Sequence, residues 1–131
     1  MINVNETKRT SLPPISSRLD SGVMVITFGD FDPFHWNEYT DRFSELLSGI
    51  ARMTRPAVVV EPRGDYFGSA LLDQLLRLYK KVSNAGGTMA FVPGNSVHSE
   101  ILRQTRLDQL WPCFATVGDA VTHLQSSRQD E

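Results

Sequence analysis

The stretch PAVVVEPRGDYFGSALLDQLLRLYKKVSNAGGTMAFV, residues 56–92, decides the fold. Its first apolar run, Ala57 to Val60, is uninterrupted, which is typical of a strand that is buried on both faces. From Ser69 onward, apolar residues recur every three or four positions, which predicts an amphipathic helix that Gly86-Gly87 terminates. Thr88 to Val92 follows as the next strand. Two strands joined by such a helix are expected to pair in parallel, as a right-handed βαβ unit.

A strand-turn-strand pattern lies on the N-terminal side of this unit. Val23 to Phe28 is rich in β-branched and aromatic residues and predicts a strand. Ile15 to Leu19, which precedes the turn signal Asp20-Ser21-Gly22, predicts a short edge strand that pairs with it as a hairpin. Apolar residues at helical spacing then predict a helix from about Trp36 to Met53.

Three shorter elements are expected after the βαβ unit. Asn95 or Ser96 can cap a short helix, on whose surface we expect His98. Cys113 to Val117 is a candidate last strand, and Asp119 to Gln125 predicts a final helix. Taken together, the elements predict the α/β class, with a mixed sheet of four to five strands packed by about four helices.

Length and composition bound the organisation and the class of protein. The 131 residues allow one domain, expected over residues 15–125, between a polar arm (1–14) and a polar tail (126–131). A net charge of -2 provides no broad basic field for nucleic acid. No apolar run approaches the ~20 residues that span a bilayer, and the N-terminus has no apolar signal core. The single cysteine, Cys113, excludes an internal disulfide framework. We therefore expect a cytoplasmic protein that binds neither nucleic acid nor membrane.

Ser69 stands where the helix of the central unit begins. A serine at this position commonly caps the helix, because its hydroxyl accepts a hydrogen bond from a free backbone N–H. It is also a candidate phosphorylation site, since a phosphate would face the positive end of the helix. Both interpretations remain open from the residues alone.

Gly29-Asp30-Phe31-Asp32 closes the strand before the first helix. Turn and capping chemistry is the common role of acidic residues in such a loop. Alternatively, Asp30 and Asp32 form a carboxylate pair at the carboxyl edge of the sheet, where the loop holding Ser69 is also expected. Such a pair could hold Mg²⁺, with His35 and Glu38 nearby in sequence.

Aromatic residues flank both loops, and Tyr66 and Phe67 with Gly68 precede Ser69 directly. They predict a partly apolar docking patch for a protein partner. The chain has no phosphate-binding Gly-Lys-Ser/Thr loop and no HExxH motif. No catalytic residue, resident metal or cofactor is therefore expected.

At these residues the chain resembles a STAS domain, the family of bacterial anti-sigma factor antagonists. The likeness runs from about Leu19 to Leu124. The loop of Asp30 and Asp32 matches the family's Gly-Glu-Leu-Asp at the end of a strand. Gly68-Ser69-Ala70-Leu71-Leu72-Asp73 stands in place of its Asp-Ser-Ser-Gly-Leu-Gly loop, and Gly86-Gly87 matches the Gly-Gly before its next strand.

The resemblance implies a non-enzymatic switch. In such proteins the first serine of the motif, here Ser69, is phosphorylated by a partner kinase that is also an anti-sigma factor, and the unmodified form binds that kinase. Asp32 takes the position of the family's loop Asp near this serine. The partner-binding residues implied are Asp30, Asp32, Tyr66, Phe67, Gly68 and Ser69.

Two alternatives remain at the level of sequence. Gly68, Ala70 and Leu71 depart from the family's motif, which is compatible with a constitutive STAS scaffold or a transporter-associated subunit that is not switched. The strand that leads into Asp30 and Asp32 also resembles that of a small Mg²⁺-dependent phosphatase of the haloacid-dehalogenase type, with Asp119 in its late acidic motif.

Overall fold

A computed structural model describes residues 15–29, 36–63 and 69–129, without the side chains of residues 36–39, 69–70 and 127–129. Its elements follow the predicted order. They are β1 (Ile15–Asp20), β2 (Val23–Phe28), α2 (Trp36–Ala51), β3 (Ala57–Pro62), α3 (Ser69–Asn84), β4 (Thr88–Phe91), α4 (Ser96–Gln104), the 3₁₀-helix η2 (Leu107–Gln109) and α5 (Val117–Gln129).

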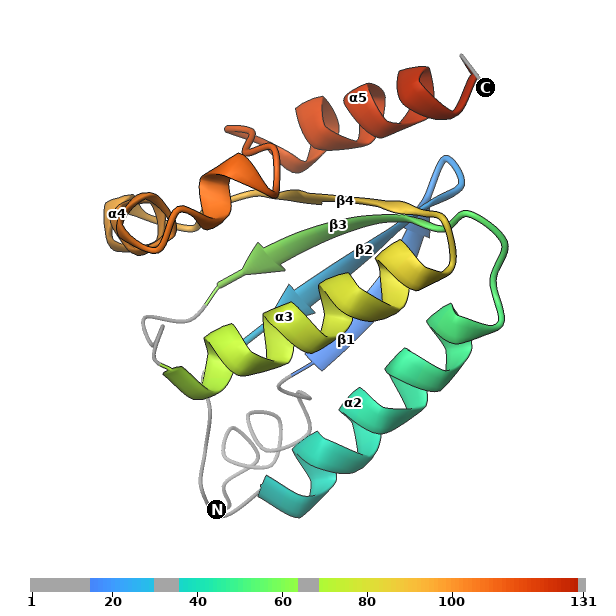
Figure 1. Cartoon of the computed structure of the whole chain (residues 1–131), viewed down its shortest axis with the longest axis horizontal. Coiled ribbons are helices and arrows are strands. Elements are labelled where there is room, and N and C mark those ends of the chain that lie inside the picture. Colours follow the sequence, from blue (N-terminus) through green and yellow to red (C-terminus); the bar gives the residue numbers. More distant parts are fainter. Residues whose placement is uncertain (1–14, 30–35, 64–68, 130–131) are drawn as a thin grey trace, which may run out of the picture.

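The four strands form one mixed sheet in the order β1-β2-β3-β4 (Figure 1). β1 is antiparallel to β2, whereas β2, β3 and β4 are parallel to one another. Ser21 and Gly22, with φ of 55° and 85°, form the two-residue turn of the first hairpin. Two successive positive φ values define the type I′ turn, whose twist matches that of the paired strands. The α/β prediction and its mixed sheet are confirmed.

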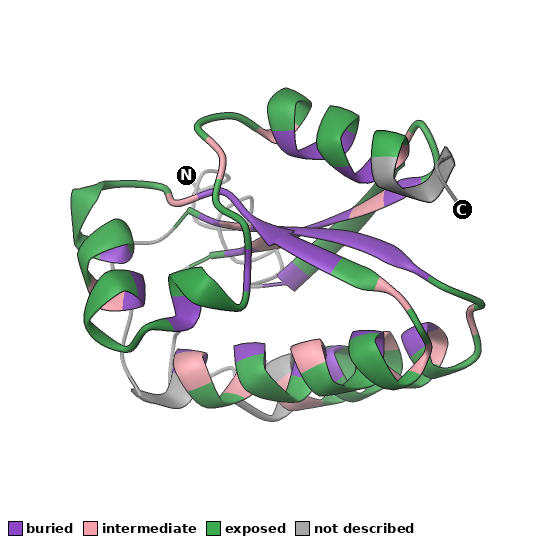
Figure 2. Cartoon of the chain, turned by 45° about the horizontal axis from the view of Figure 1, so that its top comes forward, coloured by how far each residue is buried: buried purple, intermediate pink, exposed green. Residues whose placement is uncertain are grey.

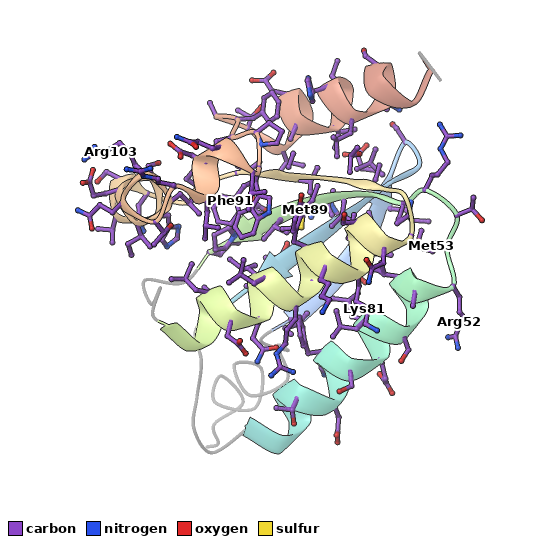
Figure 3. All side chains as sticks on the ribbon, viewed as in Figure 1. Arg52, Met53, Lys81, Met89, Phe91 and Arg103 are labelled. Carbon is purple, nitrogen blue, oxygen red and sulfur yellow. The ribbon has the colours of Figure 1, made fainter. Side chains whose placement is uncertain are left out.

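Helices cover both faces of the sheet, α2 and α3 on one side and α5 on the other (Figures 1 and 2). Side chains alternate along β3, so that Val58 and Val60 join the core beneath α2 and α3 while Val59 joins the core beneath α5. Met89 and Phe91 of β4 belong to the first core (Figure 3). The uninterrupted apolar run of β3 is therefore buried on both faces, as predicted.

Gly86-Gly87 ends α3 as predicted. Gly86 has a φ of 77° and donates its N–H to the Ser83 carbonyl (3.0 Å), while Gly87 donates to the Val82 carbonyl (2.9 Å). This pair of bonds is the Schellman motif, which requires a left-handed residue after the helix. A Cβ on Gly87 would overlap the Pro56 carbonyl oxygen, so glycine also lets β3 and β4 begin side by side.

The predicted strand from Cys113 to Val117 does not form, and only an isolated β-bridge to β4 is present there. Phe91 donates its N–H to the Pro112 carbonyl and accepts from Phe114 N–H, both at 2.9 Å, and Cys113 pairs in parallel with Phe91. The chain then leaves the edge, because Thr116 accepts the Asp119 N–H on its Oγ1 (3.0 Å) and so starts α5. The fifth strand is thus absent from the described residues, and α5 runs two residues earlier and four later than predicted.

Candidate functional site

The strands β2, β3 and β4 end at one edge of the sheet, the carboxyl edge. Phe28 and Pro62, the last residues of β2 and β3, are paired in register. Arg63 donates its N–H to the Phe28 carbonyl (2.7 Å), which ties the exit of β3 to that of β2. The segments that leave β2 and β3 therefore start from adjacent positions, as expected for loops at the carboxyl ends of parallel strands.

The predicted partner-binding residues follow the ends of β2 and β3 in the sequence. Asp30, Asp32, Tyr66, Phe67 and Gly68 fall outside the described residues. Ser69 is the first residue of α3, as predicted. The structure thus places the strand ends that flank both loops side by side, and it places the backbone of Ser69 at the head of α3.

The first turn of α3 contains no acidic residue. The partial positive charge of this helix end is therefore not compensated by a carboxylate within the turn. Leu71, which stands where the family's motif has glycine, is only 4% exposed and belongs to the core beneath α3. Its burial anchors the start of the helix to the sheet.

A third loop, from β4 to α4, packs against the same edge. A Cβ on Gly94 would lie 2.6 Å from the Pro62 carbonyl oxygen, so the backbone of this loop passes directly over the end of β3. Asn95 caps α4 by accepting the His98 N–H on its Oδ1 (3.0 Å). Of the two caps left open by the sequence, Asn95 is the one used.

The expectation that His98 lies on a helix surface is wrong. Its side chain is fully buried, and its Nδ1 accepts the Gly94 N–H at 2.9 Å. The third helical residue thus bonds back to the entry of its own helix, as a glutamate does in a capping box. The spacing Asn95-x-x-His98 is the sequence signal for this arrangement, although a capping box usually has Glu or Gln where this chain has His98.

Glu61 is a charged residue at this edge that the sequence did not single out. It precedes Pro62 in β3, and 18% of its side chain is exposed. Its Oε1 accepts the Thr27 hydroxyl (3.4 Å) and lies 3.5 Å from a guanidinium nitrogen of Arg63. These partners link the ends of β2 and β3 by side chains as well as by backbone.

A groove of about 320 Å³ opens between α4 and the segment that follows η2. It is lined by Pro93, Asn95, Ser99, Cys113, Phe114 and Ala115.

Burial raises the pKa of the Cys113 thiol, and the negative charge of Asp108 raises it further. The thiol also donates to the Trp111 carbonyl (3.5 Å), which favours the protonated form. Val97, the second residue of α4, leaves 55% of its surface exposed.

Of the three aspartates in the predicted phosphatase site, Asp30, Asp32 and Asp119, the structure describes only Asp119. Asp119 is exposed in the first turn of α5, where its backbone N–H bonds to Thr116. No group of three or more His, Cys, Asp or Glu side chains that could hold a metal ion occurs among the described residues. The pair Asp30 and Asp32 is not among them.

No protein-family model and no curated protein matches this chain. Solved structures do match. One is an anti-sigma factor antagonist from Mycobacterium paratuberculosis, with a TM-score of 0.68 and 20% identity over 85% of this chain and 92% of that one. Another is an anti-sigma-factor antagonist (STAS) domain protein from Planctomyces limnophilus, with the same TM-score and identity over 85% of this chain and 97% of that one. The chain has the fold of a STAS domain.

This STAS fold confirms the resemblance drawn from the two loop motifs and the Gly-Gly before β4. In the parts of the chain that the structure describes, no helix is long and apolar enough to cross a membrane.

Proposed function

We propose that this STAS-like chain is a non-enzymatic, cytoplasmic regulator that binds a protein of the anti-sigma factor class. The observation that carries the proposal is the likeness in fold to two anti-sigma factor antagonists over 85% of the chain. The docking surface is the carboxyl edge, where the exits of β2 and β3 and the β4–α4 loop converge. Asp30, Asp32, Tyr66, Phe67 and Gly68 contribute from the first two exits, and Ser69 from the head of α3.

Ser69 is the proposed switch residue. It is the first residue of a helix of 16 residues whose first turn carries no carboxylate. A phosphate there gains from the helix dipole, so phosphorylation is compatible with the folded chain. The same phosphate adds about 1.5 to 2 negative charges to the docking surface, and the repulsion and desolvation that follow weaken the bound complex.

The experiment combines a pull-down from native lysate with phosphopeptide mapping. The tagged full chain is expected to retain a kinase of the anti-sigma class, and incubation with ATP is expected to place one phosphate on Ser69. Ser69→Ala should bind without being modified, whereas Ser69→Asp should bind more weakly. Ser83→Asp, at the exposed far end of the same helix, is the matched control and should bind normally. If Ser69 gains no phosphate and Ser69→Asp binds as well as the native chain, the switch is wrong.

A constitutive scaffold is the second candidate, and the burial of Leu71 favours it. A glycine at this position would leave the helix start easier to reshape, whereas Leu71 is held in the core. This candidate predicts stable co-purification that is indifferent to Ser69, and the same variants distinguish it from the switch.

A phosphatase assay with Mg²⁺ tests the non-enzymatic part of the proposal. We expect no turnover. Activity that Asp30→Asn abolishes would instead support the haloacid-dehalogenase-type reaction.

A further inference from the structure

β1 forms an open edge of the sheet. The sheet order places β1 outermost, and within the described part of the chain no strand pairs with its outer side. The two-residue turn is closed by the pair Asp20 and Val23, which is therefore hydrogen-bonded. Because hydrogen-bonded pairs alternate along an antiparallel ladder, Ile15, Ser17 and Leu19 direct their N–H and C=O groups away from β2.

Leu19 is the most exposed of the large apolar side chains at the described positions, at 70%. It pairs with Met24, and directly paired residues of two strands point to the same face. Met24 packs against the core beneath α2 and α3, so Leu19 also lies on the α2 side of the sheet. A leucine this exposed on an open strand loses about 1.5 to 3 kcal/mol of burial energy that a partner could recover.

A groove of about 470 Å³ lies on the same side, between β1 and α2. Its walls are Ile15, Ser16, Ser17, Met24, Arg42, Glu45, Leu46 and Gly49. A Cβ on Gly49 would meet no atom within 4 Å, so the groove stays open at this point of the helix.

We propose that a second copy of this chain docks on the β1 edge, with the Leu19 of each copy in the β1–α2 groove of the other. Two β1 strands that pair in antiparallel fashion about Ser17 bring Ile15 of one copy opposite Leu19 of the other. The outward backbone groups of these residues then exchange up to about six hydrogen bonds. Since paired side chains share a face, each Leu19 meets the groove beside the other copy's Ile15.

The charges on α2 fit this two-fold arrangement. Arg42 and Glu45 lie about one helical turn apart on the groove wall, and both are exposed. A two-fold axis reverses α2 of the second copy, so that the arginine of each copy faces the glutamate of the other. Arg18 falls opposite Ser16, and no two like charges are directly opposed across the paired strands.

Sedimentation equilibrium of the full chain tests the proposal. The native chain is expected to dimerise at micromolar concentration, and Leu19→Arg should raise the dimer dissociation constant at least about tenfold. Gly49→Phe directs a bulky ring into the groove from a position where a Cβ meets no atom within 4 Å, and it should weaken the dimer to a similar extent. Val97→Arg alters another exposed apolar residue, on α4, and should leave the dimer unchanged. Circular dichroism of each variant verifies that it is folded.

Disulfide trapping tests the register. The hydrogen-bonded pair at Ser17 places the two Cα atoms about 5.5 Å apart, within the range of a disulfide. In a Cys113→Ser background, Ser17→Cys should form a cross-linked dimer on oxidation, and Arg18→Cys should do so far less. A native chain that stays monomeric up to ~100 μM overturns the proposal. This is the result expected if the chain's own N-terminal residues, or a different protein, cover the β1 edge. A dimer that both Leu19→Arg and Gly49→Phe leave intact overturns it equally.

Discussion

Gly94→Ala tests the close approach that brings the β4–α4 loop onto the carboxyl edge. The added methyl group would lie 2.6 Å from the Pro62 carbonyl oxygen and 3.1 Å from the His98 ring. Both neighbours are constrained, one by the sheet and the other by full burial and a bond to the Gly94 N–H. The strand end or the loop must therefore shift.

The expected cost is about 1–3 kcal/mol of unfolding free energy, the range for an extra methyl group in a packed interior. Urea denaturation of the dilute chain measures it. At an ordinary slope for a chain of this size, a cost of about 2 kcal/mol lowers the midpoint by about 1 M with the slope unchanged.

Gly49→Ala is the matched control, because its Cβ meets nothing within 4 Å inside α2. Alanine is the better helix former, so this variant should gain about 0.5 kcal/mol or more. A Gly94→Ala protein as stable as the native chain would refute the packing of this loop on β3.

Three further predictions follow from single contacts. Asn95→Ala removes the cap of α4 and should cost about 1 kcal/mol in urea denaturation, whereas Asn95→Asp should restore most of it. Gly87→Ala should cost more than Gly94→Ala, since its Cβ overlaps the Pro56 carbonyl oxygen. Cys113 should react with iodoacetamide more slowly than a free cysteine at mildly alkaline pH, and Asp108→Asn should speed it, because burial and then Asp108 raise the pKa of its thiol. Equal alkylation rates for the native and Asp108→Asn proteins would contradict the effect of Asp108 on the thiol. The folded chain holds the thiol proton more tightly than the unfolded chain does. The free energy of unfolding should therefore fall as the pH rises from the thiol's pKa in the unfolded chain to its raised pKa in the folded chain.

The parts of the fold that follow from local chemistry were predictable from the sequence. The turn before β2 needs two residues with positive φ, and Ser21-Gly22 supplies them. Gly86-Gly87 supplies the left-handed residue and the close approach that end α3. The continuous apolar run of β3 indicated a strand that is buried on both faces, and both cores contain its residues.

The wrong predictions concern residues whose role depends on a contact that local sequence patterns do not show. His98 was expected on a surface, but the packing of Gly94 on β3 draws its ring inward as an acceptor. Cys113 to Val117 has strand-like composition, yet Thr116 caps α5 and ends the pairing after Phe114. Thr116-x-x-Asp119 is a capping-box pattern that was readable from the sequence.

The sequence predicted where in the fold the site lies, but not all of the residues that contribute to it. Parallel strands separated by helices bring the exits of β2 and β3 to one edge, and the register of Phe28 with Pro62 shows that they meet there. Glu61 could not be singled out, because its role depends on Thr27 and Arg63 coming together across two strands.

Phosphate mapping on the full chain, after incubation with its captured kinase partner and ATP, tests directly whether Ser69 switches partner binding. We expect one phosphate, on Ser69, and release of the modified chain from a partner of the anti-sigma factor class. A chain that binds no partner of this class, or that is phosphorylated elsewhere while Ser69→Asp binds normally, would contradict it.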